Sequence, residues 1–197
     1  MRDKNFHTAI NLLNKLNVDY WICHGTLLGI IRDNKLLDWD NDVDIAVLND
    51  SFNKAEMIKV FLENGFKKKK KYFEGDGLLT FIKNEGKEID INIYYVQKTI
   101  DEKKVFINWF IPKNFFLKVI DAISNASEYK GKYYKLVNKL YFLQKLFFKI
   151  KNFLIRRKLF FSEIGYQHSY NFIDKKQQIE FENLKIQIPN RPEEYLK

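Results

Sequence analysis

The chain has 197 residues, 46% hydrophobic and 16% aromatic, which is enough apolar material for a substantial core and excludes an intrinsically disordered chain. Its single cysteine, Cys23, excludes an internal disulfide and a cysteine-based zinc cluster, and fits a small buried residue better than a reactive thiol. The formal net charge of +9 is compatible with nucleic acid, an anionic membrane surface or phosphorylated small molecules, and equally with a generally lysine-rich composition.

Regular secondary structure is predicted along the first hundred residues, because apolar residues recur at helical spacing or in short β-rich runs between turn residues. In chain order these patterns predict a helix over residues 3–17, a strand over 18–23, a helix opening at 27–32, a strand over 42–48, a helix capped within 49–51 and running to 64, and strands over 66–73, 78–83 and 88–96 with turns at 74–77 and 84–86. Gly25 and Thr26 are expected to form the turn after the first strand, and Gly65 to end the third helix. This order of elements predicts an α/β (α+β) fold.

Two lysine-rich segments carry open alternatives. Residues 133–161 predict one long basic amphipathic helix, whose apolar stripe could pack on the domain, which we favour, or lie on an anionic membrane. The stripe consists of Leu136, Leu140, Leu143, Phe147, Ile150 and Leu154. The five lysines of 67–71 fit a solvated edge strand protected from pairing with other chains, with direct phosphate contact as the alternative.

The chemistry of the chain is concentrated at Asp42 and Asp44. Because side chains alternate along a strand, the two carboxylates point to one face from backbone positions about 6.6 Å apart, while the residues between and after them point into a core. Like charges this close repel each other unless a cation lies between them, and Mg²⁺ or Mn²⁺ prefers such oxygen ligands. Asp90, on a later strand, could add a third carboxylate as metal ligand or general base. The three residues therefore predict a catalytic metal site facing a phosphate, with solvated strand-end charges as the alternative.

The turn before this strand suits an anionic ligand. Gly25 would let the backbone approach a phosphate closely, and Thr26 adds a hydroxyl near a helix N-terminus. Gly29 would permit close helix packing or close approach of a ligand.

Two larger side chains complete the predicted donor-binding set. Arg32 suits phosphate through its planar fork, with a salt bridge to Asp38 or Asp40 as the alternative. Trp39 could stack on a base or anchor its loop. Asp40 shares the parity of Asp42 and is given a supporting role, with metal ligation as the alternative. His24 is interpreted as a turn residue and His168 as structural.

These residues carry a family resemblance. The run Gly25-Thr26-Leu27-Leu28-Gly29, then Arg32, then Trp39-Asp40-Asn41-Asp42-Val43-Asp44-Ile45, resembles the signature of the LicD/fukutin family. Glu88-Ile89-Asp90-Ile91 resembles the later strand that supplies the family's third carboxylate, and residues 181–182, 186–189 and 194–196 resemble its C-terminal strand and exit. Family members commonly continue with a Tyr-Gly-containing tail, whereas this chain ends at Lys197.

The resemblance implies a nucleotidyltransferase-like mixed β-sheet flanked by helices, with a C-terminal helical region. It implies one LicD-like domain over residues 1–197, with 1–105 as catalytic core and 106–197 as helical region and C-terminal strand. The implied activity is metal-dependent transfer of a phospho-alcohol, such as phosphocholine or ribitol phosphate, from a CDP-linked donor to a cell-surface glycan or a lipid-linked glycan precursor. Mg²⁺ or Mn²⁺ is the implied cofactor.

Two other functions stay open. The same site could serve a nucleotidyltransferase that uses an NTP on a small molecule, protein or RNA, and the chain could also be an inactive basic binding module. Nucleic acid is otherwise not an expected partner. The polar N-terminus and the absence of an apolar run of membrane-spanning length predict a cytoplasmic protein, with peripheral contact at the inner membrane face as a further expectation.

Overall fold

The computed structural model describes residues 2–69, 77–84, 86–98, 100, 102–125, 129–159 and 161–197. Most of the predicted turn at 74–77, the middle of the turn at 84–86 and residues 70–73 of the predicted strand 66–73 therefore lie outside the described residues. The chain forms two compact units: a sheet unit from residues up to Lys69, Gly77–Ile107 and Tyr166–Lys197, and a helical unit that includes Asn108–Gly165.

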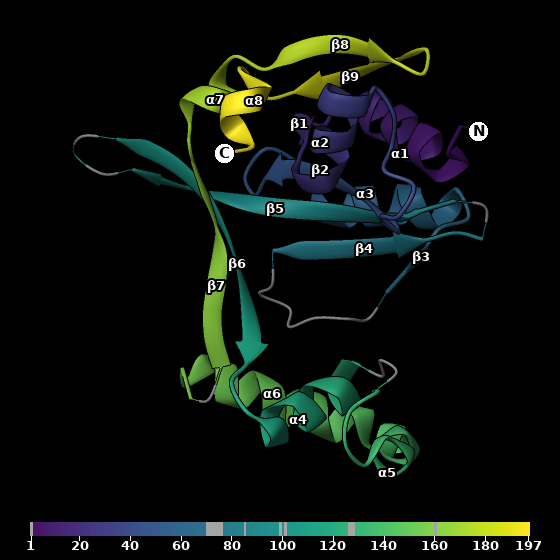
Figure 1. The fold of residues 1–197 in the computed structure, drawn as a ribbon, viewed down its shortest axis with the longest axis vertical. Helices are drawn as coiled ribbons and strands as arrows, with labels where there is room; N and C mark the ends of the chain where they lie inside the picture. The colour runs from purple at the N-terminus through teal and green to yellow at the C-terminus, as the bar shows by residue number, and fades with distance from the viewer. Residues whose placement is uncertain are drawn as a thin grey trace. The chain divides into compact units, whose positions relative to one another are not determined.

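A mixed sheet forms the sheet unit (Figure 1). Its strand order is β1–β2–β5–β4–β3, with β6 pairing with β5 and β7 with β6. The strands are β1 (Tyr20–Ile22), β2 (Asp42–Leu48), β3 (Lys67–Lys68), β4 (Leu78–Ile82), β5 (Glu88–Lys98), β6 (Lys103–Pro112) and β7 (Phe161–Ser169). Strands β2 and β5 are parallel, while β1, β4 and β6 run antiparallel to their partners in this pair. The predicted mixed sheet flanked by helices is confirmed.

One face of this sheet packs into the apolar core. Alternate residues of β2 and β5 are fully buried there: Val43, Ile45, Val47, Ile89 and Ile91. Phe81 of β4 lies opposite Ile89 and its ring is 4.5 Å from that of Phe61 in α3. The helices α1 (Lys4–Lys15), α2 (His24–Asp33) and α3 (Lys54–Glu63) belong to this unit. Because the apolar residues use one parity of each strand, the acidic residues between them all face the other side.

The C-terminal segment of the sheet unit is a hairpin with two short helices. It contains α7 (Asn171–Asp174), β8 (Gln177–Phe181), β9 (Leu184–Ile188) and α8 (Pro192–Tyr195). Glu182 and Asn183 join the two strands with φ of 50° and 67°, the left-handed pair that a tight two-residue hairpin turn requires. The indole of Trp21 in β1 donates a hydrogen bond to the Tyr195 hydroxyl at 3.1 Å, so the chain's last helix is tied to its first strand.

Several predicted boundaries need correction. Gly25 and Thr26 do not form a turn; they lie in the first turn of α2, because His24 takes a φ of 49° and the chain changes direction there. The cap of α3 is Asn53, whose side chain accepts from the backbone of Ala55 and Glu56, and not a residue within 49–51. The strand predicted over 66–73 is described only as β3, whose Lys67 and Lys68 are exposed. The sequence patterns do not predict the strands β6 and β7. Strand β6 is defined by its pairing with β5, and local periodicity does not indicate such a pairing.

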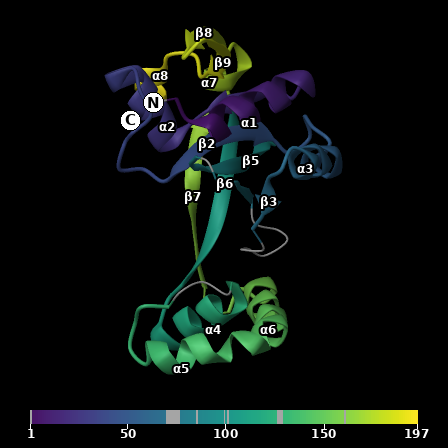
Figure 2. The same ribbon diagram turned by 90° about the vertical axis from the view of Figure 1, so that its right-hand side faces the viewer.

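The helical unit contains α4 (Phe115–Asn125), α5 (Tyr134–Lys139), the 3₁₀ turn η1 (Leu140–Leu143) and α6 (Gln144–Arg156) (Figure 2). The single helix predicted over 133–161 is therefore wrong, because the 3₁₀ turn interrupts it. Its predicted stripe packs only in part: Leu140 and Phe147 contact the buried Ile123 cluster of α4, whereas Leu136 is 59% exposed.

A buried ion pair joins α4 to α6. Lys151 is 2% exposed, and its Nζ lies 2.7 Å from Asp121 Oδ1 and 3.3 Å from Asn125 Oδ1. Among the described residues, no helix is both long enough and apolar enough to cross a bilayer.

Candidate functional site

Three aspartates meet on the polar face of the sheet. Asp42 and Asp44 both point from β2 to this face, and the β2–β5 register pairs Asp44 directly with Asp90. Asp90 is 8% exposed. Asp40 approaches from the loop before β2, where its Oδ2 lies 2.6 Å from the position that a Cβ on Gly25 would take. Parallel pairing thus gathers, over one short stretch of sheet, carboxylates that are almost fifty residues apart in the chain.

The crowding of these carboxylates raises their pKa values. Burial, a hydrogen bond to Asp40 and the charges of Asp40 and Asp90 raise the pKa of Asp42 to about 7. Burial and the charges of Asp42, Asp90 and Asp40 raise the pKa of Asp44 to about 7, against a lowering contribution from Asn92. The metal-free site therefore holds protons near neutral pH that isolated aspartates would have lost.

The raised pKa values lead to a prediction about the stability of the metal-free protein. An unfolded Asp44 ionises near its ordinary pKa, whereas the folded residue stays protonated to about 7, so between these pH values folding takes up a proton and stability falls as pH rises. We expect the stability of Asp44→Asn relative to wild type, measured by urea unfolding in EDTA, to increase by about 1–3 kcal/mol from pH 4 to pH 7.5, after discounting for partial solvent exposure. The comparison cancels the opposite contribution of His24, whose pKa burial and the nearby His168 lower to about 4. A pH-independent difference would contradict the crowding.

Asn92 is a candidate site residue that the sequence does not predict. It is 2% exposed, and its Nδ2 donates to Asp44 Oδ1 at 3.1 Å and contacts Cys23 Sγ at 3.8 Å. The backbone N–H of Asp44 donates to Thr26 Oγ1 at 2.8 Å, so Thr26 positions Asp44 from the other side. The alternation of Asp90, Asn92 and Tyr94 along β5 is the signal that could have identified this polar ladder.

A hydroxyl lies beside Asp90 on the next strand. Thr80 of β4 is the register partner of Asp90 and is 1% exposed. Its Oγ1 has no hydrogen-bond partner among the described residues. Thr80 therefore offers an unused donor and acceptor at the edge of the acidic cluster.

The ladder continues into a cluster of histidine and tyrosine rings. The Tyr94 hydroxyl lies 3.2 Å from His24 Nε2, and the His24 ring lies 4.7 Å from Tyr166. His168 stacks on Tyr195 at 4.0 Å, and its buried Nε2 has no hydrogen-bond partner among the described residues. His24 and His168, for which the sequence predicts no catalytic role, thus lie at the end of the ladder that begins at the aspartates.

The glycines of α2 have packing roles that can be seen directly. A Cβ on Gly29 would lie 2.6 Å from the backbone oxygen of Lys35 and 3.0 Å from Leu37, so this glycine permits the helix to pack against the following loop. Of its two predicted roles, close packing is the one that the structure displays. Gly25 instead makes room for the Asp40 carboxyl.

We therefore expect Gly29→Ala to destabilise the protein by about 1–3 kcal/mol, because backbone atoms cannot yield as a flexible side chain would. Chemical denaturation measures the effect. An unchanged midpoint would show that the loop at Lys35 moves freely.

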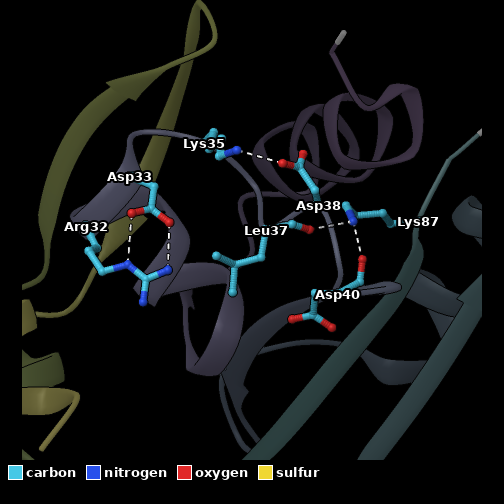
Figure 3. Close-up of polar contacts among 7 residues, drawn as sticks. All are labelled: Arg32, Asp33, Lys35, Leu37, Asp38, Asp40 and Lys87. Atoms are coloured by element: carbon cyan, nitrogen blue, oxygen red, sulfur yellow. Dashed lines mark hydrogen bonds and ion pairs between the residues drawn. The ribbon is translucent and has the colours of Figure 1, made fainter.

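Of the two larger side chains predicted to bind the donor, Arg32 lies in the last turn of α2 and Trp39 in the loop that follows; Figure 3 shows Arg32 and the polar contacts of this loop. Arg32 pairs with its neighbour Asp33 at 2.7 Å, and with neither of the alternatives Asp38 and Asp40, and its head is solvent-exposed. Trp39 is 73% exposed, so it does not anchor the loop by burial. Lys87 fixes the loop instead, since its Nζ donates to the backbone oxygens of Leu37, at 3.0 Å, and Asp40.

The carboxylates fit a divalent cation by their chemistry, because a cation would relieve the repulsion that raises their pKa values. As the side chains stand, however, no three His, Cys, Asp or Glu residues in the described part of the chain form a group that could hold a metal ion. Binding would therefore require the side chains to rearrange around the ion.

Sequence comparison places this site inside a known family domain. The family described as LicD/FKTN/FKRP, nucleotidyltransferase domain, matches residues 17–121, which include all the predicted site residues. Ribitol-5-phosphate transferase FKTN of Homo sapiens is 29% identical over 89 residues, 44% of this chain and 19% of that protein. An uncharacterised protein of Rickettsia typhi is 35% identical over 57 residues, 28% of this chain and 18% of that protein. The matched segments thus span about a fifth of these relatives.

Structural comparison concerns the fold. A lincosamide antibiotic adenylyltransferase, LnuA, solved with lincomycin bound, superposes with a TM-score of 0.50 at 11% identity, covering 100% of this chain and 85% of that one. The nucleotidyltransferase-like fold predicted from the sequence is confirmed.

Proposed function

Because this chain belongs to the LicD/FKTN/FKRP nucleotidyltransferase-domain family, a family that points to a transferase, we propose that it transfers a phospho-alcohol from a CDP-linked donor to a glycan hydroxyl. The observation that carries the proposal is the direct pairing of Asp44 with Asp90 beside Asp42 on one face of the sheet. The human relative is named for transfer of ribitol 5-phosphate, which makes an alditol phosphate the first group to test.

In the proposed reaction the acceptor hydroxyl attacks the phosphorus that carries the alcohol. A new bond forms between the acceptor oxygen and this phosphorus, the phosphoanhydride bond to CMP breaks, and CMP leaves with the bonding electrons. The hydroxyl proton passes to a carboxylate of the cluster, since carboxylates can act as general bases. Such transfers depend mainly on positioning and charge neutralisation.

The chain's own residues supply the positioning. Asn92 and Thr26 hold Asp44 from its side chain and its backbone. Lys87 holds the loop that presents Trp39, an exposed ring suited to stacking on the donor's base. The exposed guanidinium of Arg32 can exchange its neighbour Asp33 for a donor phosphate at little cost, because exposed ion pairs are weak.

We propose Asp42, Asp44 and Asp90 as the ligands of Mg²⁺ or Mn²⁺. Such an ion would neutralise charge on the donor phosphates. Asp90 could serve as the general base and not as a metal ligand. Thr80 is its register partner on β4 and lies next to it in both cases.

A thermal-shift panel tests the proposal. CDP-ribitol, CDP-choline, CDP-glycerol, CTP and ATP are added with and without Mn²⁺ to wild type and Asp44→Asn. A ligand at about 100 times its dissociation constant adds about 2.7 kcal/mol of stability, or about 5–10 °C for a chain of this size. We expect a metal-dependent shift with one CDP-alcohol that Asp44→Asn lacks.

Product analysis separates this activity from its closest alternative. Release of CMP supports the proposal, whereas release of pyrophosphate from CTP or ATP would identify a nucleotidyltransferase. If no nucleotide shifts the melting temperature and neither product forms, the enzyme assignment fails.

A further inference from the structure

The net charge of the protein resides in one of its two units. Residues 108–165 contain twelve lysines and arginines and three aspartates and glutamates, a net charge of +9. The whole chain has 34 basic and 25 acidic residues, also +9, so the remaining residues are neutral in sum. A generally lysine-rich composition would spread the net positive charge along the chain, whereas here the net charge is concentrated in residues 108–165.

Exposed apolar side chains gather in the same unit. Of the seventeen large apolar side chains that are exposed among the described residues, eleven lie within residues 108–165, which is less than a third of the chain. They are Ile111, Phe115, Phe116, Tyr133, Tyr134, Leu136, Phe142, Leu146, Ile150, Phe153 and Leu159. Scattered exposed apolar residues are ordinary on soluble proteins, but a concentration of this kind marks an interaction surface.

The helix α6 shows how charge and apolar surface are combined. Its inner side packs on α4 through Leu154 and Ile155, and through the Lys151–Asp121 pair. A second apolar stripe faces outward at helical spacing: Phe142 of η1 is 79% exposed, Leu146 53%, Ile150 37% and Phe153 57%. We call these four residues the outer stripe.

Lysines lie along the outer stripe. Lys145 and Lys149, at the edge of the stripe, are both exposed. Their long aliphatic stems allow the charged heads to extend away from an apolar layer while the stripe enters it. This is the composition of a helix that lies in the plane of a membrane interface, apolar on one side and rich in lysine beside it.

We propose that the helical unit binds the surface of an anionic lipid bilayer through the outer stripe and its flanking lysines. Nucleic acid would use the lysines but leave Leu146 and Ile150 without a function, because aliphatic side chains neither stack on bases nor contact phosphate. A second copy of this unit would bring two charges of +9 together, which disfavours self-association. The proposal concerns this unit alone and does not depend on the transferase activity.

Vesicle sedimentation tests the proposal with the full chain. We expect the protein to bind vesicles of 30% phosphatidylglycerol in phosphatidylcholine. Binding to vesicles of pure phosphatidylcholine should be at least 10-fold weaker, and binding to the anionic vesicles should weaken at least 10-fold in 0.5 M NaCl. Leu146→Gln/Phe153→Gln should weaken binding at least 10-fold at unchanged charge, and Lys145→Gln/Lys149→Gln should weaken it by a similar factor on anionic vesicles. All four side chains are exposed and glutamine is a good helix former, so circular dichroism should stay native.

Matched changes in the sheet unit serve as controls. Leu62→Gln removes a large side chain that is 47% exposed, and Lys54→Gln/Lys175→Gln removes two exposed charges; both variants should bind vesicles as wild type does. A fluorophore attached to Leu146→Cys reports insertion directly, since the native Cys23 is fully buried and its raised pKa keeps it unreactive.

Three results would overturn the proposal. The first is no binding to anionic vesicles, and the second is equal loss of binding in the control variants. The third is binding of single-stranded RNA that needs Lys145 and Lys149 but not the outer stripe, with no binding to vesicles.

Discussion

Replacement of Asp44 by asparagine is expected to lower turnover by about 10³-fold or more while the protein stays folded. Asp44 lies at the centre of the acidic cluster, paired with Asp90 in the sheet register and held by Asn92 and Thr26. Asparagine keeps the size of the side chain and an oxygen that can accept from Asn92, so the geometry should survive. It removes the charge that a divalent cation or a donor phosphate–metal complex would need, and losses of charge at such sites cost several kcal/mol in the transition state.

The same variant should be more stable than wild type at neutral pH in the absence of metal, because it removes a crowded carboxylate. Loss of activity together with a gain in stability cannot be explained by misfolding. Asp50→Asn, in the exposed turn after β2, is the matched control and should change neither quantity. Full activity of Asp44→Asn would remove these aspartates from the reaction.

Replacement of Asp121 by asparagine should destabilise the helical unit by about 3–5 kcal/mol. Lys151 is almost completely buried between α4 and α6, and Asp121 is its ion-pair partner at 2.7 Å. Removing one member of a buried pair leaves the other charge in a medium of low dielectric constant, which costs more than the pair itself contributes. Hydrogen exchange of the α4 and α6 amides, together with urea unfolding, measures the local and the global effect.

Two comparisons define the origin of this loss. Replacing both residues, Asp121→Leu with Lys151→Met, should restore most of the stability, because no charge then stays buried. Asp38→Asn breaks the Lys35–Asp38 pair, which has a similar distance of 2.6 Å but an Asp38 side chain that is 81% exposed, and should leave the unfolding midpoint unchanged. Equal effects at the two sites would show that Lys151 is hydrated.

The local features of the site could be predicted from the sequence because they depend on short-range periodicity. The strand predicted over 42–48 is β2 residue for residue, and the alternation of its side chains places Asp42 and Asp44 on one face. The helix predicted over 3–17 is found as Lys4–Lys15. The family could be recognised because its signature is long and continuous in the chain, and the match to residues 17–121 confirms it.

Errors arose where a boundary depends on a single residue or on a distant partner. His24 takes a left-handed conformation and α2 starts there, three residues earlier than predicted, so Gly25 and Thr26 lie in a helix and not in a turn. Arg32 pairs with its immediate neighbour Asp33 and not with either of the two aspartates in the following loop. Amphipathic periodicity continued through residues 140–143, yet the chain forms a 3₁₀ turn there that lets α5 and α6 each pack on α4.

The sequence by itself determined the family, the strand with two aspartates and the basic, aromatic character of residues 108–165, since each is a property of contiguous residues. Only the tertiary structure decided that Asp90 lies beside Asp44, that Asn92 and Thr26 hold Asp44, and that α6 exposes a second apolar stripe. The register of a parallel strand pair is set by side-chain packing across a long connection, and the face that a helix buries is set by the helix it meets. Neither contact is written in the local pattern, so both had to be found in the folded chain.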